Sequence, residues 1–180
     1  MSDSTPKTTA EVLSLVDQAW KAIESTVARL RPAQLTDVRD PAGWAVKDHL
    51  MHVAAWEDGL LARLTGRPTH EALGLDEATL AQDEDTQNAA IFARHRHRPL
   101  AEVLDAVRTS HRAIRARLAA LGDRAVAGPV ADIVPPSAPR TARTGSSDRN
   151  ESPAAAWIAG NTWEHYAAHH AWIRDLVDRG

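Results

Sequence analysis

The chain has 180 residues, a formal net charge of −3 and no cysteine. This length suits a single domain over residues 1–180, and the small negative charge argues against nucleic acid or an anionic membrane as a partner. The lack of cysteine excludes disulfides, thiolate ligands and a cysteine nucleophile, so a bound metal needs nitrogen or oxygen ligands.

The N-terminal part of the chain predicts a first helix. The segment MSDSTPKTTAEV has no apolar signal region, and no stretch approaches the ~18 uncharged apolar residues of a membrane span, so we expect a soluble, cytoplasmic protein. Thr8 and Glu11 have capping-box spacing, and apolar residues recur at helical spacing from Val12 to Leu30. Pro32 ends this helix.

The second predicted helix follows the turn PAGW and spans residues 45–64, with its apolar residues on one face. Gly66 and Pro68 end it. A mixed stretch over 68–80 leads into a shorter polar helix at about 77–96, which we expect to lie across the bundle.

The third long helix is predicted to start with Pro99 at its first position and to carry an inward apolar stripe from Leu100 to Leu121. Gly122 ends it. Residues 122–152 are rich in proline, glycine, serine and arginine and lack periodicity, so we expect a long flexible loop or lid there.

The last predicted helix has Ser152 as its N-cap and Pro153 at its first position, and runs to about Asp178. The sequence contains no strand pattern and no repeat. The predicted fold class is therefore all-α: an antiparallel up-down four-helix bundle with an extra short helix and one long loop before the last helix.

Two histidines of the last helix, His165 and His169, fall at the centre of its apolar sector on a helical wheel. Their i, i+4 spacing puts their Cβ atoms about 6 Å apart, so both imidazoles can bind one ion. His170 points about 100° away from His169 and is expected at the surface. The alternative is that each is a buried histidine with a hydrogen bond. Burying two imidazoles without partners costs about 1–3 kcal/mol each, which a shared metal offsets.

A third ligand must come from another helix, and the second helix offers His49 and His52. His49 lies nearer the middle of the apolar sector and His52 at its edge, so periodicity slightly favours His49. Trp56 lies one turn beyond His52 and either walls a pocket or fills the core. Glu57 lies inside the apolar sector, where it is a base, a partner of a ligand, or a structural acceptor for an indole N–H.

Other polar residues carry weaker signals. His111 lies on the inward stripe of the third helix and is expected to be a packed core histidine. The run RHRHR at 94–98 is expected to interact with helix-terminal carbonyls and water, and the acidic run at 83–85 to form a solvated face. No nucleotide-binding glycine motif, nucleophile elbow or HExxH motif is present.

Three segments together resemble one family. GWAVKDHLMHVAAWE (43–57) and NTWEHYAAHHAWIRDL (161–176) resemble the second and last helices of the DinB-like superfamily, and more narrowly of its DfsB-like branch. QNAAIFARHRHRPLAEVL (87–104) is similar to the middle segment of that branch. Ala45 departs from the pattern, because a serine or threonine helix cap is usual at that position.

The resemblance implies an up-down four-helix bundle that holds a divalent metal, nickel or zinc. In the superfamily the ligands are one histidine of the second helix and an HxxxH pair of the last. On this sequence the matching positions are His52, His165 and His169, so the resemblance favours His52 over His49.

The superfamily includes thiol-dependent S-transferases, maleylpyruvate isomerase and metal-dependent hydrolases, and the DfsB-like branch includes the colibactin self-resistance protein. The resemblance therefore implies a metal-dependent enzyme acting on a small electrophilic molecule, by hydrolytic detoxification or self-resistance. Glu57, Asn161 and Tyr166 are the candidate catalytic or substrate-orienting residues.

Three alternatives stay open. The enzyme can be an S-transferase or isomerase, which needs a low-molecular-weight thiol as cosubstrate because the chain has no thiol of its own. It can be a non-catalytic protein that sequesters a small molecule, with Trp56, Trp163 and Trp172 as pocket walls. Its histidines can also be structural, with homodimerisation as the only activity.

Overall fold

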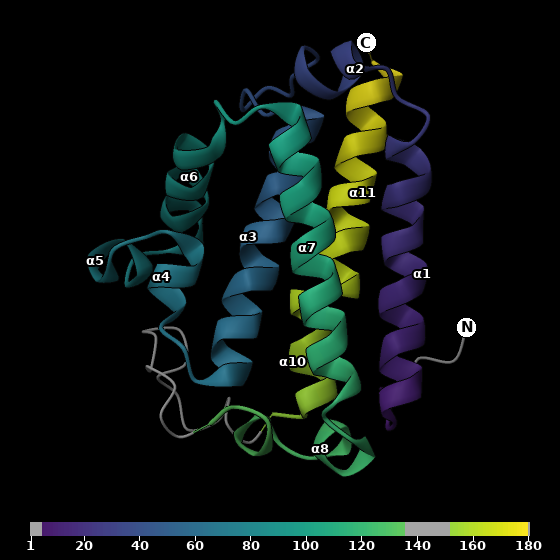
Figure 1. Ribbon diagram of the computed structural model, residues 1–180, viewed down its shortest axis with the longest axis vertical. Coiled ribbons are helices and arrows are strands. Elements are labelled where there is room, and N and C mark those ends of the chain that lie inside the picture. Colours follow the sequence, from purple (N-terminus) through teal and green to yellow (C-terminus); the bar gives the residue numbers. More distant parts are fainter. Residues whose placement is uncertain (1–4, 136–151, 180) are drawn as a thin grey trace.

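The computed structural model describes residues 5–135 and 152–179, and every regular element in these ranges is a helix (Figure 1). The long segments form the body of the molecule: α1 (Thr9–Val27), α3 (Val46–Thr65), α7 (Leu100–Ala119), and α10 (Ala154–Asn161) followed by α11 (Trp163–Asp178). The all-α helical bundle predicted from the sequence is confirmed. No helix in the described ranges is both long and apolar enough to cross a membrane.

Shorter helices cover the ends and one side of this bundle: α2 (Pro32–Thr36), α4 (Thr69–Leu73), α5 (Glu77–Leu80), α6 (Glu84–His95), α8 (Asp123–Ala127) and the 3-10 helix η1 (Val130–Asp132). In Figure 1, α4 to α6 lie beside α3, while α2 and α8 lie at opposite ends. Part of the loop predicted over 122–152 is therefore helical, and residues 136–151 of it lie outside the described residues.

The polar helix predicted over 77–96 is two helices, α5 and α6, and it lies beside α3 and not across the bundle (Figure 1). The side chain of Asp83 accepts the Thr86 N–H at 2.8 Å and so caps a new helix start. This cap competes with continuation of α5, because aspartate hydrogen-bonds the backbone more readily at a helix N-terminus than inside a helix.

Some helix ends match the sequence prediction and others shift: α1 ends at Val27, before Pro32, while Pro99 and Pro153 are the N-caps of α7 and α10 and not their first residues. Thr8 and Glu11 form the predicted capping box at the start of α1. Gly66 ends α3 in the left-handed conformation, with φ of 74°, which a side chain at that position would disfavour.

The relative directions of the long helices determine which residues lie close together at the site. Lys47 Nζ donates to the Arg96 carbonyl just before α7 begins, and Arg117 near the end of α7 donates to the Leu64 carbonyl near the end of α3. α3 and α7 therefore run in the same direction and do not alternate as the up-down prediction had them, because α4 to α6 carry the chain back to the end where α3 starts (Figure 1). α11 runs antiparallel to α3 and lies beside it.

The predicted last helix is broken at Thr162, whose φ of −134° and ψ of −101° are not helical. Its hydroxyl donates to the Ile158 carbonyl at 2.7 Å, and the residue is fully buried. The break separates α10 from α11, so His165 lies in the first turn of α11.

The interior is built from apolar side chains of all the long segments. Val16, Leu50, Ile114, Ile158 and Ile173 are each at most 2 % exposed. Complete burial of a side chain of this size stabilises the fold by about 1.5–3 kcal/mol, so this shared core holds α3 and α11 firmly side by side.

Candidate metal centre

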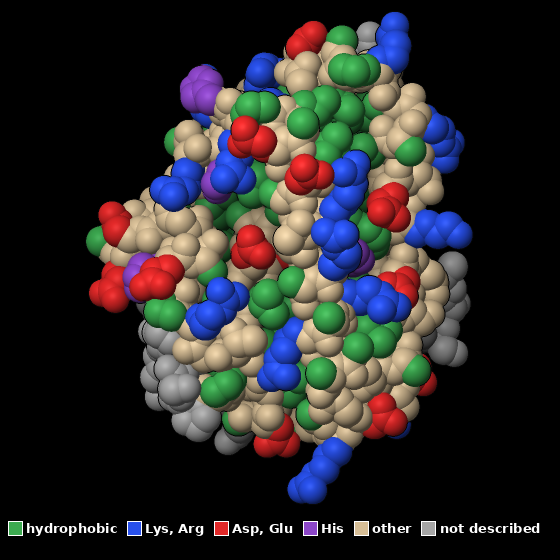
Figure 2. All heavy atoms as spheres, in the orientation of Figure 1, with side chains coloured by type: hydrophobic (Ala, Val, Ile, Leu, Met, Phe, Trp, Pro, Cys, Tyr) green, Lys and Arg blue, Asp and Glu red, His purple; other side chains and the backbone are tan. Residues whose placement is uncertain are grey.

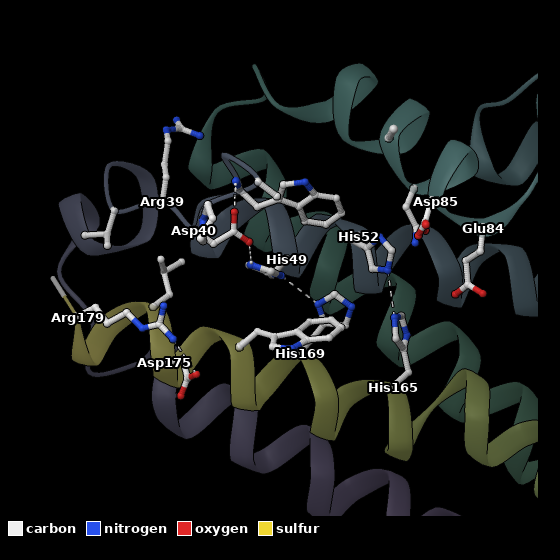
Figure 3. Close-up of a pocket in the computed structure, with 18 residues that line it drawn as sticks. Arg39, Asp40, His49, His52, Glu84, Asp85, His165, His169, Asp175 and Arg179 are labelled. Atoms are coloured by element: carbon white, nitrogen blue, oxygen red, sulfur yellow. Dashed lines mark hydrogen bonds and ion pairs between the residues drawn. The ribbon is translucent and has the colours of Figure 1, made fainter.

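Three histidines from two helices meet between α3 and α11. His52 lies on α3, and His165 and His169 lie one turn apart on α11. Each offers one ligand nitrogen, and the three nitrogens lie within 4.8 Å of one another. The Nε2 atoms of His52 and His165 are 3.1 Å apart (Figure 3). The fold thus brings together the three residues that the resemblance selects as metal ligands.

Burial keeps these imidazoles neutral. Desolvation lowers the pKa of His52 from the ordinary 6.5 to about 3, and that of His165 to about 4. The pKa of His169 is also lowered, first by burial and then by the neighbouring His52 and His165. A neutral imidazole keeps a lone pair for a metal, so at pH 7 these donors fit a divalent ion that prefers nitrogen ligands, such as Zn²⁺ or Ni²⁺.

His49, the ligand that periodicity favours, also faces inward but lies outside this set of three nitrogens. Its Nδ1 lies 3.2 Å from Nδ1 of His169, and its Nε2 lies 3.4 Å from a carboxylate oxygen of Asp40. Burial lowers the pKa of His49, and Asp40 opposes that shift. His49 therefore contacts His169 through Nδ1 and is not one of the three candidate ligands.

Two tryptophans lie against the histidines. Trp44 stacks on Phe92, with ring centroids 5.0 Å apart, and its ring lies 5.3 Å from those of both His49 and His52. Trp172 meets the ring of His169 edge to face at 4.7 Å and is 53 % exposed. One indole is thus held within the protein and the other lies largely in solvent.

The histidines and both tryptophans line one cavity of about 900 Å³. Its walls come from the 38–44 connection, α3, α6 and α11 and consist of Val38, Arg39, Asp40, Pro41, Ala42, Trp44, His49, His52, Glu84, Asp85, Asn88, Ala89, His165, His169, Trp172, Asp175, Leu176 and Arg179. Figure 3 places the carboxylates of α6 beyond His165 and the arginines at the opposite end, beyond His49. The cavity is large enough for a drug-sized molecule.

Glu57 and Tyr166, two of the predicted catalytic residues, lie together in the interior and not on this cavity. The Tyr166 hydroxyl donates to Glu57 Oε1 at 2.5 Å, and the Ser110 hydroxyl donates to Oε2 at 2.5 Å. His111 Nδ1 lies 3.1 Å from Oε1, and its ring stacks on Trp20 at 3.8 Å. Burial, followed by the Glu57 carboxylate, raises the pKa of Tyr166 well above 10, which keeps its hydroxyl protonated as a donor.

The other predicted residues divide between the cavity and the rest of the bundle. Trp172 lines the cavity, whereas Trp56 and Trp163 do not. The Trp56 indole donates to the Asn88 side chain at 3.1 Å, and Trp163 packs against the main core. The Asn161 amide donates to the Trp157 carbonyl at 2.7 Å, at the end of α10.

Several cavity residues did not stand out in the sequence. Glu84 and Asp85 belong to a charge run that predicts a solvated face, and Asn88 carries no pattern at all. They reach the cavity because α6 folds back along α3. Trp44 lies in the 43–57 segment that carries the family resemblance, eight residues before His52, and that segment was the signal for its place beside the histidines.

Comparison with known proteins identifies the family of this chain and a solved structure of similar fold. The model of the DinB superfamily matches residues 15–173. No curated protein matches the chain significantly. The crystal structure of an uncharacterised protein from Escherichia coli UTI89 is similar in fold, with a TM-score of 0.69 at 15 % identity, covering 99 % of this chain and 97 % of that one.

Proposed function

This chain belongs to the DinB superfamily, and from that premise we propose that it is a metal-dependent enzyme acting on a small electrophilic molecule. The observation that carries the proposal is the position of His52, His165 and His169 on the wall of the 900 Å³ cavity. Buried neutral imidazoles beside a cavity of this size combine a ligand set with room for a substrate.

His52, His165 and His169 would hold a divalent ion, which would lower the pKa of a bound water or thiol. The chain's own residues supply the surroundings. Trp44 and Trp172 give the cavity apolar walls beside the histidines, and the buried positions of His52 and His169 keep bulk water away from one side. Desolvation of this kind strengthens electrostatic interactions with a reacting group.

We infer hydrolytic detoxification or self-resistance as the finer function. Its support is the resemblance of segments 43–57 and 161–176 to the DfsB-like branch. Thiol transfer is the alternative within the same site, and it differs in the nucleophile. Because the chain contains no cysteine, that reaction needs a low-molecular-weight thiol from solution.

Sequestration of a small molecule is a second candidate function, and the exposure of Trp172 favours it. An indole that is 53 % exposed on the rim of a cavity is free to stack on a planar ligand. A sequestering protein returns its ligand chemically unchanged.

Metal content tests the first proposal. Tag-free protein from cells grown with zinc and nickel should carry about one equivalent of metal by elemental analysis, as expected for one three-histidine site. His52→Ala, His165→Ala and His169→Ala should each abolish it, whereas His97→Ala, at an exposed histidine, should not. Metal-free wild-type protein, or full metal content in His52→Ala, contradicts the site.

Turnover then separates the functions. The metal-loaded protein is incubated with epoxides and activated esters, with and without a low-molecular-weight thiol, and products are identified by mass spectrometry. Hydrolysis without thiol that stops on chelation supports the hydrolase, and thiol adducts support the transferase. Binding without any product supports sequestration.

A further inference from the structure

We propose that Asp40 and His49 form a chain of polar contacts that fixes the tautomer of His169 and so prepares its Nε2 to bind a metal. This proposal rests on the proposed metal site. It assigns His49 a positioning role, since His49 acts on the ion through His169 and not as a ligand.

The two ring nitrogens of His169 have different surroundings. Its Nδ1 lies 3.2 Å from Nδ1 of His49, at hydrogen-bonding distance (Figure 3). With Nδ1 engaged in this way, Nε2 is the nitrogen that His169 has left for an ion. A ligating Nε2 needs a free lone pair, so the ring proton must be on Nδ1, and His49 Nδ1 must accept it.

The tautomer of His49 depends on its contact with Asp40. Its Nε2 is buried and makes no hydrogen bond within the part of the chain that is described; it faces Oδ2 of Asp40 at 3.4 Å, the distance of an ion-pair contact. A carboxylate can only accept, so this contact favours the tautomer with a proton on Nε2. That tautomer leaves the lone pair on Nδ1 of His49, where it can accept the proton on Nδ1 of His169. The Asp40 carboxylate therefore sets the direction of the hydrogen bond between His49 and His169.

Asp40 is held in place by hydrogen bonds to the backbone of Trp44. Its Oδ1 accepts the Trp44 N–H at 2.8 Å, and its own N–H donates to the Trp44 carbonyl at 2.9 Å. The turn that precedes α3 thus fixes the carboxylate and aims Oδ2 at His49. Figure 3 shows Asp40, His49 and His169 joined in sequence by these contacts.

His52 differs from His49 in its charged neighbours. Its Nδ1 is also buried without a hydrogen-bond partner among the described residues, but no carboxylate contact like that between Asp40 and His49 is found there. Outer partners that orient a metal-binding histidine typically change metal affinity by about 10–100-fold when they are removed. We therefore expect His169 to depend on His49, and the Asp40 end of the chain to matter at a distance from the ion.

Zinc affinity tests this chain through three variants, measured by competition with a chromophoric chelator. His49→Leu removes the acceptor and should weaken zinc binding by about 10–100-fold. His49→Gln offers an amide oxygen in its place and should recover most of the loss. Asp40→Asn keeps an oxygen for the Trp44 N–H but can turn a donor toward His49, which should reverse the chain and weaken binding by about 10-fold or more. His97→Ala is the control.

A second readout needs no metal. Long-range ¹H–¹⁵N spectra of metal-free wild-type protein should show His169 protonated on Nδ1 and His49 on Nε2, and Asp40→Asn should shift His169 toward the other tautomer. A merely structural role for His49 would not reverse that tautomer. The opposite tautomers in wild type, or wild-type zinc affinity in folded His49→Leu, overturn the chain while leaving the metal site intact. If wild-type protein binds no zinc, the proposed function fails, and the tautomers alone decide the chain.

Discussion

Trp172 is an exposed aromatic residue on the cavity wall and a candidate contact for a bound ligand. It is the large apolar side chain that the described part of the chain leaves exposed, and its ring touches His169 at the cavity. A ligand that covered this indole would remove apolar surface from water beside the candidate metal centre. The residue therefore offers a test of ligand binding that is separate from metal binding.

We expect Trp172→Ala to weaken binding of a planar probe such as 2-naphthol by about 2–10-fold, the range of one aromatic pair. Trp172→Phe should retain most of the affinity because it keeps an aromatic face. Isothermal titration on metal-loaded protein measures both variants. Equal affinity in wild type and Trp172→Ala would show that the ligand does not stack there.

Tyr166 supports a second prediction at this scale. Tyr166→Phe leaves the buried Glu57 carboxylate without one of its donors, which should lower the free energy of unfolding by about 1–3 kcal/mol. Urea denaturation of metal-free protein measures the change. Ser110→Ala removes the donor to the other oxygen of Glu57 and should act in the same direction. A loss below about 0.5 kcal/mol in both variants would mean that the network contributes little.

The limits of sequence reasoning are clearest for residues on α3. Periodicity slightly favoured His49, yet His49 and His52 are almost equally buried, at 4 % and 5 % exposed, and it is His52 that lies with His165 and His169. The wheel gives the direction of a side chain but not the position of the facing helix. Glu57 was correctly placed inside the apolar sector, yet its partners Ser110 and Tyr166 depend on the register of α7 and α11, which no local pattern encodes.

At the scale of elements, the start of α3 carries an incomplete cap. The Asp48 side chain accepts the Ala45 N–H at 2.9 Å, but Ala45 has no side-chain oxygen to accept a backbone N–H in return. Its φ of −88° and ψ of 169° are those of an ordinary N-cap. The backbone is therefore ready for a serine at this position.

Ala45→Ser should raise the free energy of unfolding by about 0.5–1 kcal/mol, because the new hydroxyl can accept the Asp48 N–H. Zinc affinity should stay the same, since the cap lies a full turn before His49. Urea denaturation measures the first quantity and chelator competition the second. Ala45 is fully buried, so a fall in stability would mean that the added oxygen does not fit.

Helix existence was easier to predict than helix continuity. The capping box of α1 and the glycine that ends α3 were legible because they act within one turn. The break at Thr162 was not, because a threonine inside a periodic apolar segment gives no stop signal. It is stabilised by burial and by a hydrogen bond to Ile158, which depend on the packed bundle.

At the scale of the whole molecule, buried neutral histidines make stability depend on pH. His52 and His165 have folded-state pKa values of about 3 and about 4, against 6.5 in the unfolded chain. Below pH 6.5 the unfolded chain therefore binds protons that the folded protein does not, so stability falls on acidification. Asp58, whose pKa burial raises to about 6, opposes this fall.

The free energy of unfolding of the metal-free protein should be lower at pH 5 than at pH 7 by at least about 2 kcal/mol, since His52, His165 and His169 together outweigh Asp58. Urea denaturation with a chelator present measures it. His52→Phe should reduce the difference between the two pH values. A difference that is unchanged in this variant would mean that other groups dominate the titration.

The arrangement of whole helices was only partly accessible from sequence. Composition and periodicity predict an all-α bundle, but not that α3 and α7 run in the same direction, because that depends on where α4 to α6 return the chain (Figure 1). This return also brings α6 to the cavity. On the face shown in Figure 2, acidic and basic side chains are interspersed over the surface, in keeping with the small net charge.

The hydrogen bond between Glu57 and Tyr166 has a consequence for how such a protein can diversify. It ties α3 to α11 next to the positions of His52 and His165, so the ligand geometry is set by the bundle itself. Most of the remaining cavity wall comes from the 38–44 connection and α6. Libraries that randomise those two segments, while keeping Asp40 and Trp44, should yield many folded proteins with altered ligand preference. Substitutions in the 38–44 connection and α6 should therefore change ligand preference without moving the three histidines of the candidate metal centre.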